Sequence, residues 1–233
     1  MVFKMPLISI IIPTKNEEKR LPLLLNCLKR QTFKDFEVVV ADAKSEDQIR
    51  EIAKNYGCKI VDGGVPSVGR NNGAKVAKGD IFIFFDADII IPKNFLEVSL
   101  KLFKKKKLDV GAFYTFALEK KVINDIIVGV INVHMFFTQK IKPYAWGFGI
   151  IIKRELHEAI NGFNEKLYYF EDSDYVRKAS KLGKFAIFNK KSKLRYSFRR
   201  FEREGIINMI FKCLKLMSKK DKTKIKYKDY FKC

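Results

Sequence analysis

Two carboxylates spaced i, i+2 follow a short apolar run, and these are the residues of the sequence best suited to chemistry. The run extends from Ile81 to Phe85, and the carboxylates are Asp86 and Asp88. β-Branched and aromatic residues in such a run predict a buried strand, so both acids are expected at the carboxyl edge of a sheet, where open α/β folds bind ligands. Two carboxylates there suit a divalent cation that carries a diphosphate, because Mg²⁺ usually takes one or two carboxylates together with substrate phosphates. The plain alternative is a strand that ends in a polar turn.

Apolar runs of two kinds divide the first half of the chain into alternating elements. Short runs with strand propensity alternate with segments whose leucines recur at helical spacing. The predicted strands are 7–12, closed by Pro13, then 36–41, 59–61 and 81–85, and the predicted helices are 17–31, 45–56, with Ser45 as its N-cap, and 71–77. This alternation is typical of a parallel sheet with helices on both faces, so we expect an α/β fold.

The second half has longer helices and shorter strands. The predicted helices are 95–107, 123–137, 155–160 and 173–182, and the predicted strands are 110–118, at a sheet edge, then 150–152 and 185–188. A glycine-rich loop that begins at Trp146 leads into the strand at 150–152. No low-complexity linker separates the halves, so we expect them to share one sheet.

Composition narrows the class of protein. The 233 residues allow one large domain or one domain with an appendage, and an apolar content of 47% with 21 Phe provides for a core. Lys and Arg outnumber Asp and Glu by 47 to 26, and the net charge of +21 favours nucleic acid, phosphorylated substrates or an anionic membrane as partners. The four cysteines form no C-x-x-C pair, which argues against a zinc or disulfide framework and fits a reducing cytosol. Neither a signal peptide nor a transmembrane helix is expected, since no uncharged apolar run approaches about 18 residues.

The segment 205–233 differs from the rest of the chain. Four of its apolar residues share one helical face: Ile206, Ile210, Leu214 and Met217. A lysine-dense stretch follows them. An apolar face with basic flanks suits a helix that lies in the interface of an anionic membrane. The alternative is a C-terminal helix that packs on the domain and ends in a solvated lysine tail.

Four polar motifs occur in a fixed order along the chain. They are Pro13-Thr14-Lys15-Asn16-Glu17, Ala41-Asp42, Gly69-Arg70-Asn71-Asn72-Gly73 leading to Asp86-Ala87-Asp88, and Glu171-Asp172-Ser173-Asp174. Over residues 7–205 this order resembles glycosyltransferase family 2, the nucleotide-sugar transferases of the GT-A fold. The resemblance extends to a bacterial and archaeal subgroup through Trp146-Gly147-Phe148-Gly149, Gly162-Phe163 and Ser197-Phe198-Arg199-Arg200.

The resemblance implies a fold, a domain division and an activity. The fold would be a Rossmann-like GT-A sheet, with a catalytic domain at 1–204 and a basic amphipathic segment at 205–233. Within that domain, 1–91 would bind the nucleotide sugar and 92–204 the acceptor. The activity would be a metal-dependent inverting sugar transfer that uses Mg²⁺ or Mn²⁺ and favours UDP over GDP as the donor nucleotide. The acceptor would be a glycan or a polyprenyl-phosphate lipid, reached from the cytoplasmic side at the inner face of the cell membrane, with no nucleic acid as partner.

The resemblance also implies the donor-binding residues. Pro13, Lys15 and Glu17 would cradle the base and ribose, and Asp42 would accept the imide N–H of the base, which favours uracil. The usual run of two acids and a glycine is here Ala41-Asp42-Ala43, so the choice of base stays open. Arg70, expected just before a helix of small residues, would bind the diphosphate together with that helix N-terminus, the alternative being a surface arginine.

The remaining implied residues hold the metal and carry out the transfer. Asp86 and Asp88 would bind the metal and the ribose-phosphate part of the donor, with Asp88 favoured as the direct ligand. Asp172 would be the general base that takes the proton of the acceptor hydroxyl; its neighbours Glu171 and Asp174 would be helix-terminal acids. Three further residues would close over the diphosphate or stack on the sugar: Arg199, Arg200 and Trp146. Both histidines, at 134 and 157, are expected to be structural.

Two other functions remain as alternatives at this level. A sugar-phosphate nucleotidyltransferase also combines an α/β fold with acids for magnesium, but it carries a glycine-rich loop with an arginine after the first strand. This chain has Pro13-Thr14-Lys15-Asn16-Glu17 there. A nucleic-acid-binding protein would account for the charge of +21, but the basic residues are spread out and no recognised binding motif is present.

Overall fold

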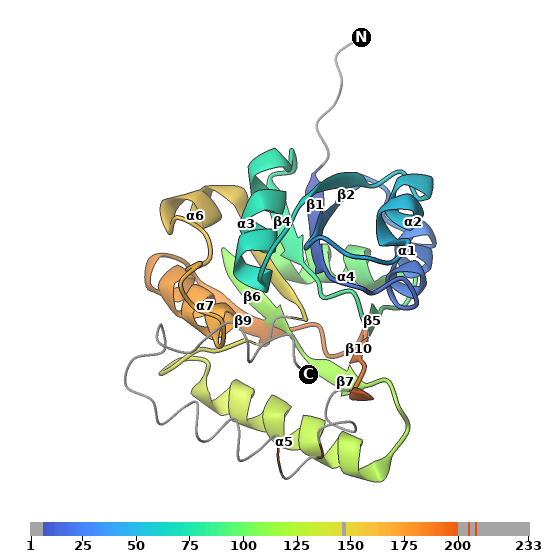
Figure 1. The fold of residues 1–233 in the computed structure, drawn as a ribbon. Helices are drawn as coiled ribbons and strands as arrows, with labels where there is room; N and C mark the ends of the chain where they lie inside the picture. The colour runs from blue at the N-terminus through green and yellow to red at the C-terminus, as the bar shows by residue number, and fades with distance from the viewer. Residues whose placement is uncertain (1–6, 146–147, 200–204, 206–207, 209–233) are drawn as a thin grey trace.

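A seven-stranded mixed sheet forms the centre of the protein (Figure 1). The structure is a computed structural model that describes residues 7–145, 148–199, 205 and 208. The strands stand in the order β3-β2-β1-β4-β8-β6-β9, with bounds β1 (Ile8–Thr14), β2 (Phe36–Asp42), β3 (Lys59–Asp62), β4 (Ile81–Phe84), β6 (Val110–Phe113), β8 (Ile150–Lys153) and β9 (Phe185–Phe188). Neighbouring pairs are parallel except those of β8, which runs antiparallel to β4 and β6. The expectation of a mostly parallel sheet shared by both halves of the chain is confirmed.

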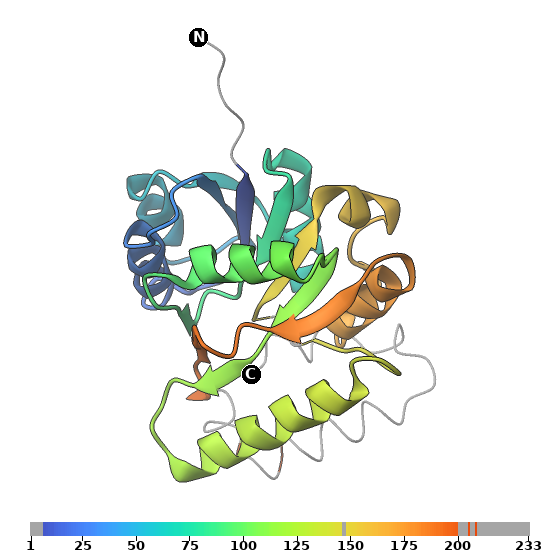
Figure 2. The ribbon, with the colours of Figure 1, turned by 180° about the vertical axis from the view of Figure 1, so that it is seen from behind.

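Helices cover both faces of this sheet. One face carries α1 (Leu21–Lys29), α2 (Ile49–Asn55) and α4 (Phe95–Lys105), and the other carries α3 (Pro66–Val76), α6 (Arg154–Ala159) and α7 (Glu171–Leu182). The α3 face is turned to the viewer in Figure 1, and α4 lies in front in Figure 2. Alternation along β1 accounts for the two layers, because Ile10 and Ile12 join the core under α1 while Ile11 joins the core under α3.

A smaller sheet lies beyond the carboxyl edge of the large one. Its strands are β5 (Ile89–Ile90), β10 (Leu194–Tyr196) and β7 (Thr115–Ala117), in the order β5-β10-β7. A long helix, α5 (Val122–Thr138), packs against it (Figure 1). The single edge strand predicted at 110–118 is therefore wrong: the segment breaks at Tyr114 into β6, which is internal to the large sheet, and β7, which belongs to the small one. A strand as short as β5 has too few residues to show the alternation of apolar and polar residues by which strands are predicted from a sequence.

The helices of the first half begin at other residues than predicted. α1 begins at Leu21 because the amides of Arg20 and Leu21 both donate to the carbonyl of Glu17 in a preceding turn (2.9 Å each). α2 begins at Ile49, and Ser45 does not cap it, since its hydroxyl accepts the amide of Asn16 (2.9 Å) instead. α3 begins five residues early, at 66, where proline occupies the first helical turn and its missing N–H costs nothing.

Two positions and one segment singled out by the sequence lie outside the described residues. Trp146 and Arg200 are among them, as is the segment 205–233 apart from residues 205 and 208. Within the part of the chain that the structure describes, no helix is long and apolar enough to cross a bilayer.

Two glycines on α3 let this helix lie directly on β1. A Cβ at Gly73 would overlap Cγ2 of Ile11, and a Cβ at Gly69 would lie 3.1 Å from Cβ of Pro13. Because the two glycines are one turn apart, they form a flat strip along the helix. This close approach brings the residues between them to the edge of the sheet where β1 ends.

We predict opposite effects for two glycine-to-alanine substitutions within helices. Gly73→Ala should destabilise the protein by about 1–3 kcal/mol, because an added methyl is forced into a packed core. Gly129→Ala, on α5 with no atom near the new Cβ, should stabilise it by up to about 1 kcal/mol through helix propensity. Urea unfolding of both variants measures the difference. Equal effects would mean that α3 does not depend on this contact.

Candidate functional site

The strand ends place the first group of acids at one edge of the sheet. Thr14, the last residue of β1, pairs with Asp42, the last residue of β2, and the amide of Ala43 donates to the carbonyl of Thr14 (2.9 Å). Pro13 lies within β1, beyond the last residue that pairs with β4, so its missing N–H breaks no bond on that side. Asp86 follows β4 at the same edge. The sequence prediction of a polar carboxyl edge is therefore confirmed in the structure.

Arg70 joins two of these elements from the inside. Its guanidinium contacts Asp86 through Nη2 and Oδ1 and Glu171 through Nη1 and Oε1, both at 2.9 Å. The side chain is only 2% exposed. The expected place of Arg70 just before a helix N-terminus is wrong, because α3 begins at Pro66 and Arg70 lies in its second turn. Its charge is already shared between two carboxylates, so the arginine fixes Asp86 relative to the start of α7.

Asn71 makes a second connection from the same turn of α3. Its side chain accepts the amide of Phe163 and donates to the carbonyl of the same residue, both at 2.9 Å, and it also donates to Glu165 (2.8 Å). Gly162 has a φ of +63°, and a Cβ there would lie 2.6 Å from Oδ1 of Asn71. The sequence analysis gave no role to Asn71. The signal in the sequence that could have identified this contact was the pair Gly162-Phe163, because Asn71 forms hydrogen bonds with the backbone of Phe163.

Asp172 lies in the first turn of α7, next to Glu171. One of its carboxylate oxygens accepts the amide of Ser173 (2.7 Å). Removal from water and then the neighbouring Glu171 charge raise the pKa of Asp172 to about 8, and the Arg70 guanidinium opposes this shift. Phe170, immediately before the helix, adopts the left-handed region with φ +60°, a conformation that costs a residue other than glycine about 1–2 kcal/mol and is often found at functional sites.

A second cluster joins the loop after β1 to the end of β10. Nη2 of Arg199 contacts Oε1 of Glu17 and lies 3.6 Å from Oδ2 of Asp88. The amide of Ser197 donates to the carbonyl of Asp88 (3.3 Å), which joins the end of β10 to the loop after β4. Burial, followed by the charges of Asp86 and Glu17, raises the pKa of Asp88 to about 7, while Arg199 lowers it. Burial also raises the pKa of Glu17.

Asp42 is fully buried and already has partners. It accepts the amide of Ser45 (3.2 Å) and Nη1 of Arg50 (3.1 Å), and the same guanidinium reaches Asp62 (3.2 Å). Arg50 was not identified from the sequence, since it lies on a short helix with no motif around it. Two buried hydroxyls, of Thr14 and Ser67, have no hydrogen-bond partner within the described residues. They lie at the end of β1 and the start of α3 and are candidate contacts for a ligand.

A family comparison agrees with this arrangement. The model of Glycosyl transferase family 2 matches residues 9–160, which is more than half of the chain. The chain belongs to glycosyl transferase family 2. The matched range contains the strand ends, Arg70 and the Asp86-Ala87-Asp88 motif, and it stops before α7.

Curated members of the family match parts of the chain. The 4,4'-diaponeurosporenoate glycosyltransferase of Staphylococcus haemolyticus is 41% identical over 91 residues, which is 35% of this chain and 24% of that protein. The poly(ribitol-phosphate) β-N-acetylglucosaminyltransferase TarS of Staphylococcus aureus is 36% identical over 112 residues, which is 44% of this chain and 20% of TarS. The match therefore covers a quarter or less of the length of each of these relatives.

Solved structures of two sugar transferases show the same fold. The crystal structure of S. aureus TarS with UDP-GlcNAc superimposes with a TM-score of 0.68 at 24% identity, covering 82% of this chain and 58% of that one. The mannosyltransferase PcManGT of Pyrobaculum calidifontis, in complex with GDP-Man and Mn²⁺, gives a TM-score of 0.62 at 20% identity, covering 91% and 65%. The GT-A fold implied by the sequence is thereby confirmed.

The carboxylates fit a metal only in part. Within the described residues, no group of three or more His, Cys, Asp or Glu side chains is arranged to hold a metal ion. Asp86 and Asp88 supply hard oxygen donors, and burial, followed by the charges of Asp86 and Glu17, raises the pKa of Asp88. Such a donor set suits Mg²⁺ or Mn²⁺ when phosphate oxygens complete the coordination. A cation held by Asp86 and Asp88 would therefore need further oxygen ligands, such as those of a bound phosphate.

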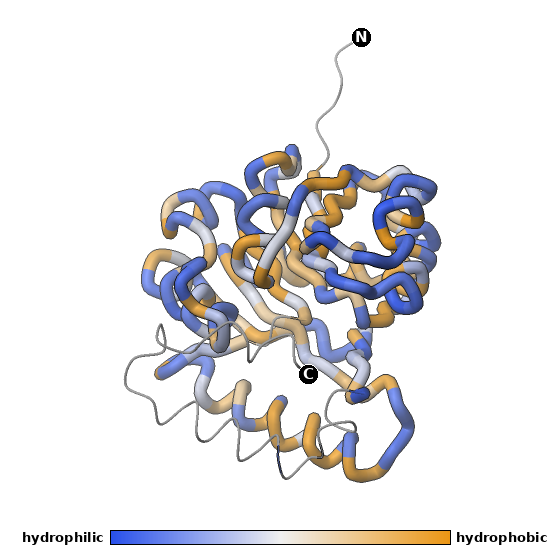
Figure 3. The backbone as a smooth tube through the Cα atoms, viewed as in Figure 1, coloured by the Kyte–Doolittle hydropathy of each residue, from blue (hydrophilic) through white to orange (hydrophobic). Residues whose placement is uncertain are grey.

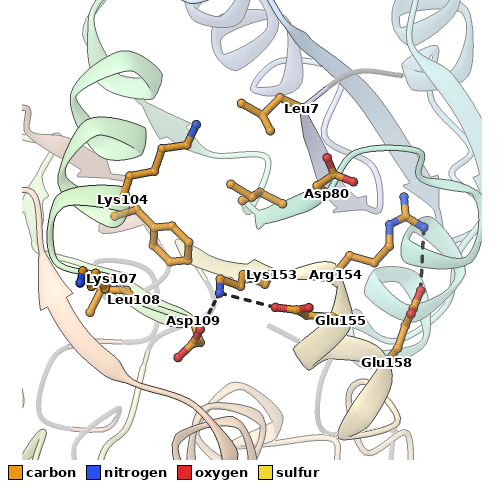
Figure 4. Close-up of a pocket in the computed structure, with 12 residues that line it drawn as sticks. Leu7, Asp80, Lys104, Lys107, Leu108, Asp109, Lys153, Arg154, Glu155 and Glu158 are labelled. Carbon is orange, nitrogen blue, oxygen red and sulfur yellow. Dashed lines mark ion pairs between the residues drawn. The ribbon is translucent and has the colours of Figure 1, made fainter. Parts of the chain in front are cut away.

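A cavity of the described structure lies elsewhere (Figure 4). It has a volume of about 660 Å³ and lies at the opposite edge of the sheet, lined by Leu7, Asp80, Asp109 and Lys153 among others. Its charged side chains neutralise one another, since Lys153 pairs with Asp109 (2.8 Å) and Arg154 with Glu158 (3.9 Å). None of the predicted site residues lines it, so it takes no part in the candidate site.

We predict that Arg70→Met destabilises the protein by about 3–5 kcal/mol, because the substitution leaves Glu171 buried without its cation. The double variant Arg70→Met/Glu171→Gln should regain much of this loss, since the buried charge of Glu171 is then removed and only the half-buried Asp86 loses its cation. The control Arg30→Met, at an exposed arginine, should change stability by less than about 0.5 kcal/mol. Chemical denaturation measures all three, and a loss for Arg70→Met no larger than that of the control would contradict the assignment.

Proposed function

We propose that this chain transfers a sugar from a nucleoside-diphosphate donor to a hydroxyl or phosphate acceptor, with inversion at the anomeric carbon. The observation that carries the proposal is the buried Arg70, which couples Asp86 on the donor side to Glu171, the neighbour of Asp172, on the other. Residues 1–204 would form the catalytic domain, with 1–91 as the donor half and 92–204 as the acceptor half. Membership of glycosyl transferase family 2 supports this function over a nucleotidyltransferase or a nucleic-acid-binding protein.

The donor would lie across the ends of β1, β2 and β4. Pro13, Lys15 and Glu17 follow one another at the end of β1, and the buried hydroxyls of Thr14 and Ser67 offer further contacts for the nucleotide. Asp42, fixed by Arg50, would accept the imide N–H of uracil, so we propose UDP over GDP as the donor nucleotide. TarS was solved with UDP and UDP-GlcNAc, which supports this choice, whereas PcManGT was solved with GDP-Man.

Asp86 and Asp88 would hold the cation, either Mg²⁺ or Mn²⁺, together with the two phosphates of the donor. A cation bound there supplies stabilisation of the negative charge that develops on the departing diphosphate. The presence of Mn²⁺ in the PcManGT complex supports this proposal. Arg199 would exchange its contacts with Glu17 and Asp88 for the diphosphate, Arg200 would assist in closing over it, and Trp146 would stack on the sugar.

Asp172 would act as the general base. Its carboxylate takes the proton of the acceptor hydroxyl while that oxygen bonds to the anomeric carbon, and the bond from this carbon to the diphosphate oxygen breaks on the opposite face. The electron pair leaves with the nucleoside diphosphate, and the product has the inverted configuration. A base with a pKa of about 8 matches this task, because efficient proton transfer requires a pKa near the working pH.

The acceptor is proposed to be a glycan or a polyprenyl-phosphate lipid. TarS is named for a poly(ribitol-phosphate) acceptor, which supports a phosphate-bearing one. We also propose a cytoplasmic location, peripheral on the inner face of the cell membrane, with the lysine-dense segment 205–233 as one anchor. Each basic residue near an anionic surface contributes about 1 kcal/mol.

Asp88→Asn should weaken UDP binding that depends on Mn²⁺ and should abolish transfer, while the fold remains intact. The reason is the loss of a charged oxygen ligand at the end of β4. A thermal-shift panel of UDP-, GDP- and dTDP-sugars with and without Mn²⁺ or Mg²⁺ measures this, since a nucleotide bound to the native state raises the apparent stability. Equal UDP affinity of variant and wild type in the presence of Mn²⁺ would refute the assignment.

Asp172→Asn should leave donor binding nearly unchanged and lower kcat by about 10²–10⁴, the usual loss for a general base. The kcat/KM of the wild type should rise with pH through about 8 and level above it, because only the deprotonated Asp172 can accept a proton and half of it is deprotonated at its pKa of about 8.

The matched control is Asp174→Asn, two residues along the same helix, which should retain most of the activity. NMR assignment of the product anomer completes the test. Retention of configuration, or near-normal turnover by Asp172→Asn, would exclude this role.

A further inference from the structure

Helix α5 is apolar on two opposite sides. Its inner side packs on the domain through Asn124, Val128, Ile131 and Met135, residues that recur at helical spacing. Asn132 adds a polar contact on this side, since it accepts the amide and donates to the carbonyl of Thr115 (3.2 and 2.7 Å). A helix that is apolar all round is normally buried all round. The outer side of α5 departs from this rule.

The outer side presents a continuous apolar stripe, defined by Val122, Ile126, Val130, Val133 and Phe137. These five side chains are 51% or more exposed, with values of 78, 56, 64, 56 and 71%. Ile123 and Phe136 extend the stripe at 48 and 51%. Seven of the eleven exposed large apolar residues in the described part of the chain thus lie on this one helix. Figure 3 shows hydrophobic colour repeated along α5, and an exposed patch of this kind marks an interaction surface.

Lysines stand at both ends of the stripe. Lys120 and Lys121 precede the helix, Lys140 and Lys142 follow it, and all four are exposed. Between residues 120 and 142 the only acidic residue is Asp125. The surface therefore combines an apolar centre with a positive charge at each end.

We propose that the outer face of α5 docks on an anionic lipid surface, with the helix lying in the plane of the interface. The helix has 17 residues and is about 26 Å long at 1.5 Å per residue, and no described helix meets the requirements for a span. An apolar face between basic ends is the pattern of an interfacial helix, because the apolar side chains enter the acyl boundary while the lysines contact the headgroups.

Charge favours the lipid over two occupants from within the protein. A second copy of α5 would bring lysine ends against lysine ends in either orientation, parallel or antiparallel. The segment 205–233 of the same chain carries an apolar face but also a dense set of lysines, so it too would meet like charges at the ends of α5. An anionic lipid surface neutralises the lysines and covers the stripe at once.

The position of α5 determines which part of the protein would lie close to the membrane. Figure 1 shows α5 at the end of the molecule away from the N-terminus, beyond the small sheet. Its inner side packs through Val128 against Phe198, the neighbour of Arg199 in the candidate site. Docking would therefore hold the carboxyl edge of the large sheet close to the bilayer. The inference rests on the surface of α5 and stands apart from the proposed chemistry.

The test is sedimentation of the full chain with vesicles. Vesicles of equimolar phosphatidylglycerol and phosphatidylcholine should bring down the wild type, and pure phosphatidylcholine vesicles should not. Ile126→Ser/Phe137→Ser should weaken binding by at least about tenfold, because the apolar contact is lost. The matched control Leu23→Ser/Leu182→Ser removes two exposed leucines from α1 and α7, 44 and 67% exposed, and should bind as the wild type does. Circular dichroism and thermal unfolding verify that each variant is folded.

A second pair of variants separates docking from general charge attraction. Replacing the four lysines at 120, 121, 140 and 142 with serine should weaken binding to the anionic vesicles markedly. Replacing the four exposed lysines at 104–107, which follow one another at the end of α4, lowers the net charge equally and should have a much smaller effect. Equal losses for the two sets, or full binding by Ile126→Ser/Phe137→Ser, would overturn the proposal.

Two other outcomes would identify a different occupant. A dimer in sedimentation equilibrium that Ile126→Ser/Phe137→Ser dissociates, without vesicle binding by the wild type, would assign the stripe to a second copy. Hydrogen exchange along α5 that is slow in the full chain and fast after deletion of residues 209–233, again without vesicle binding, would assign it to the C-terminal segment. Either result would overturn the docking on lipid.

Discussion

The buried guanidinium of Arg70 is the interaction on which the arrangement of the site depends. It contacts Asp86 after β4 and Glu171 at the start of α7, two residues 85 positions apart in the chain, at 2.9 Å each. Removing a charged group from water is costly, and only partners with good geometry offset that cost. The pairing therefore allows little variation in where β4 ends relative to where α7 begins. Because Asp172 follows Glu171 directly, Arg70 also sets the separation between Asp86 and Asp172, although Arg70 itself is buried.

Helix α3, which carries Arg70, brings this residue to the carboxyl edge of the sheet. Gly69 and Gly73 permit α3 to lie against β1, and the residues between them, Arg70 and Asn71, thereby reach the carboxyl edge. Asn71 holds both backbone groups of Phe163, so the connection that leads to α7 is fixed as well. Four features thus depend on one strip of small residues. They are the close packing of α3 on β1, the buried guanidinium of Arg70, the fixed backbone at Phe163 and the position of the Asp172 carboxylate. The packing of α3 on the sheet therefore determines the geometry of the site.

Local patterns could predict the parts of the site that depend on where a strand ends. The run before Asp86 identifies a buried strand, and a parallel sheet collects such ends at one edge, so the positions of the strand-terminal acids followed from sequence. The partners of Arg70 did not, because they are separated from it by 16 and 101 residues, and no local period records a contact of that range. The start of α3 was missed for a related reason: glycines lower helix propensity, and here packing on β1 outweighs that preference. The two-residue strand β5 exists only through its pairing with β10.

The two arginines of the site have opposite environments, and this difference separates their functions. Arg70 is 2% exposed and paired with two carboxylates, so its charge is already compensated within the protein. Arg199 is 42% exposed and sits against Glu17 and Asp88, where burial and crowded negative charge raise the pKa of both acids. A cation and a diphosphate entering together would replace every interaction that Arg199 makes there and leave its guanidinium available to a phosphate oxygen. The buried arginine therefore maintains the geometry. In the proposed mechanism the exposed one would give up its place to the cation and the diphosphate, and its contacts with Glu17 and Asp88 would keep these acids compensated until then.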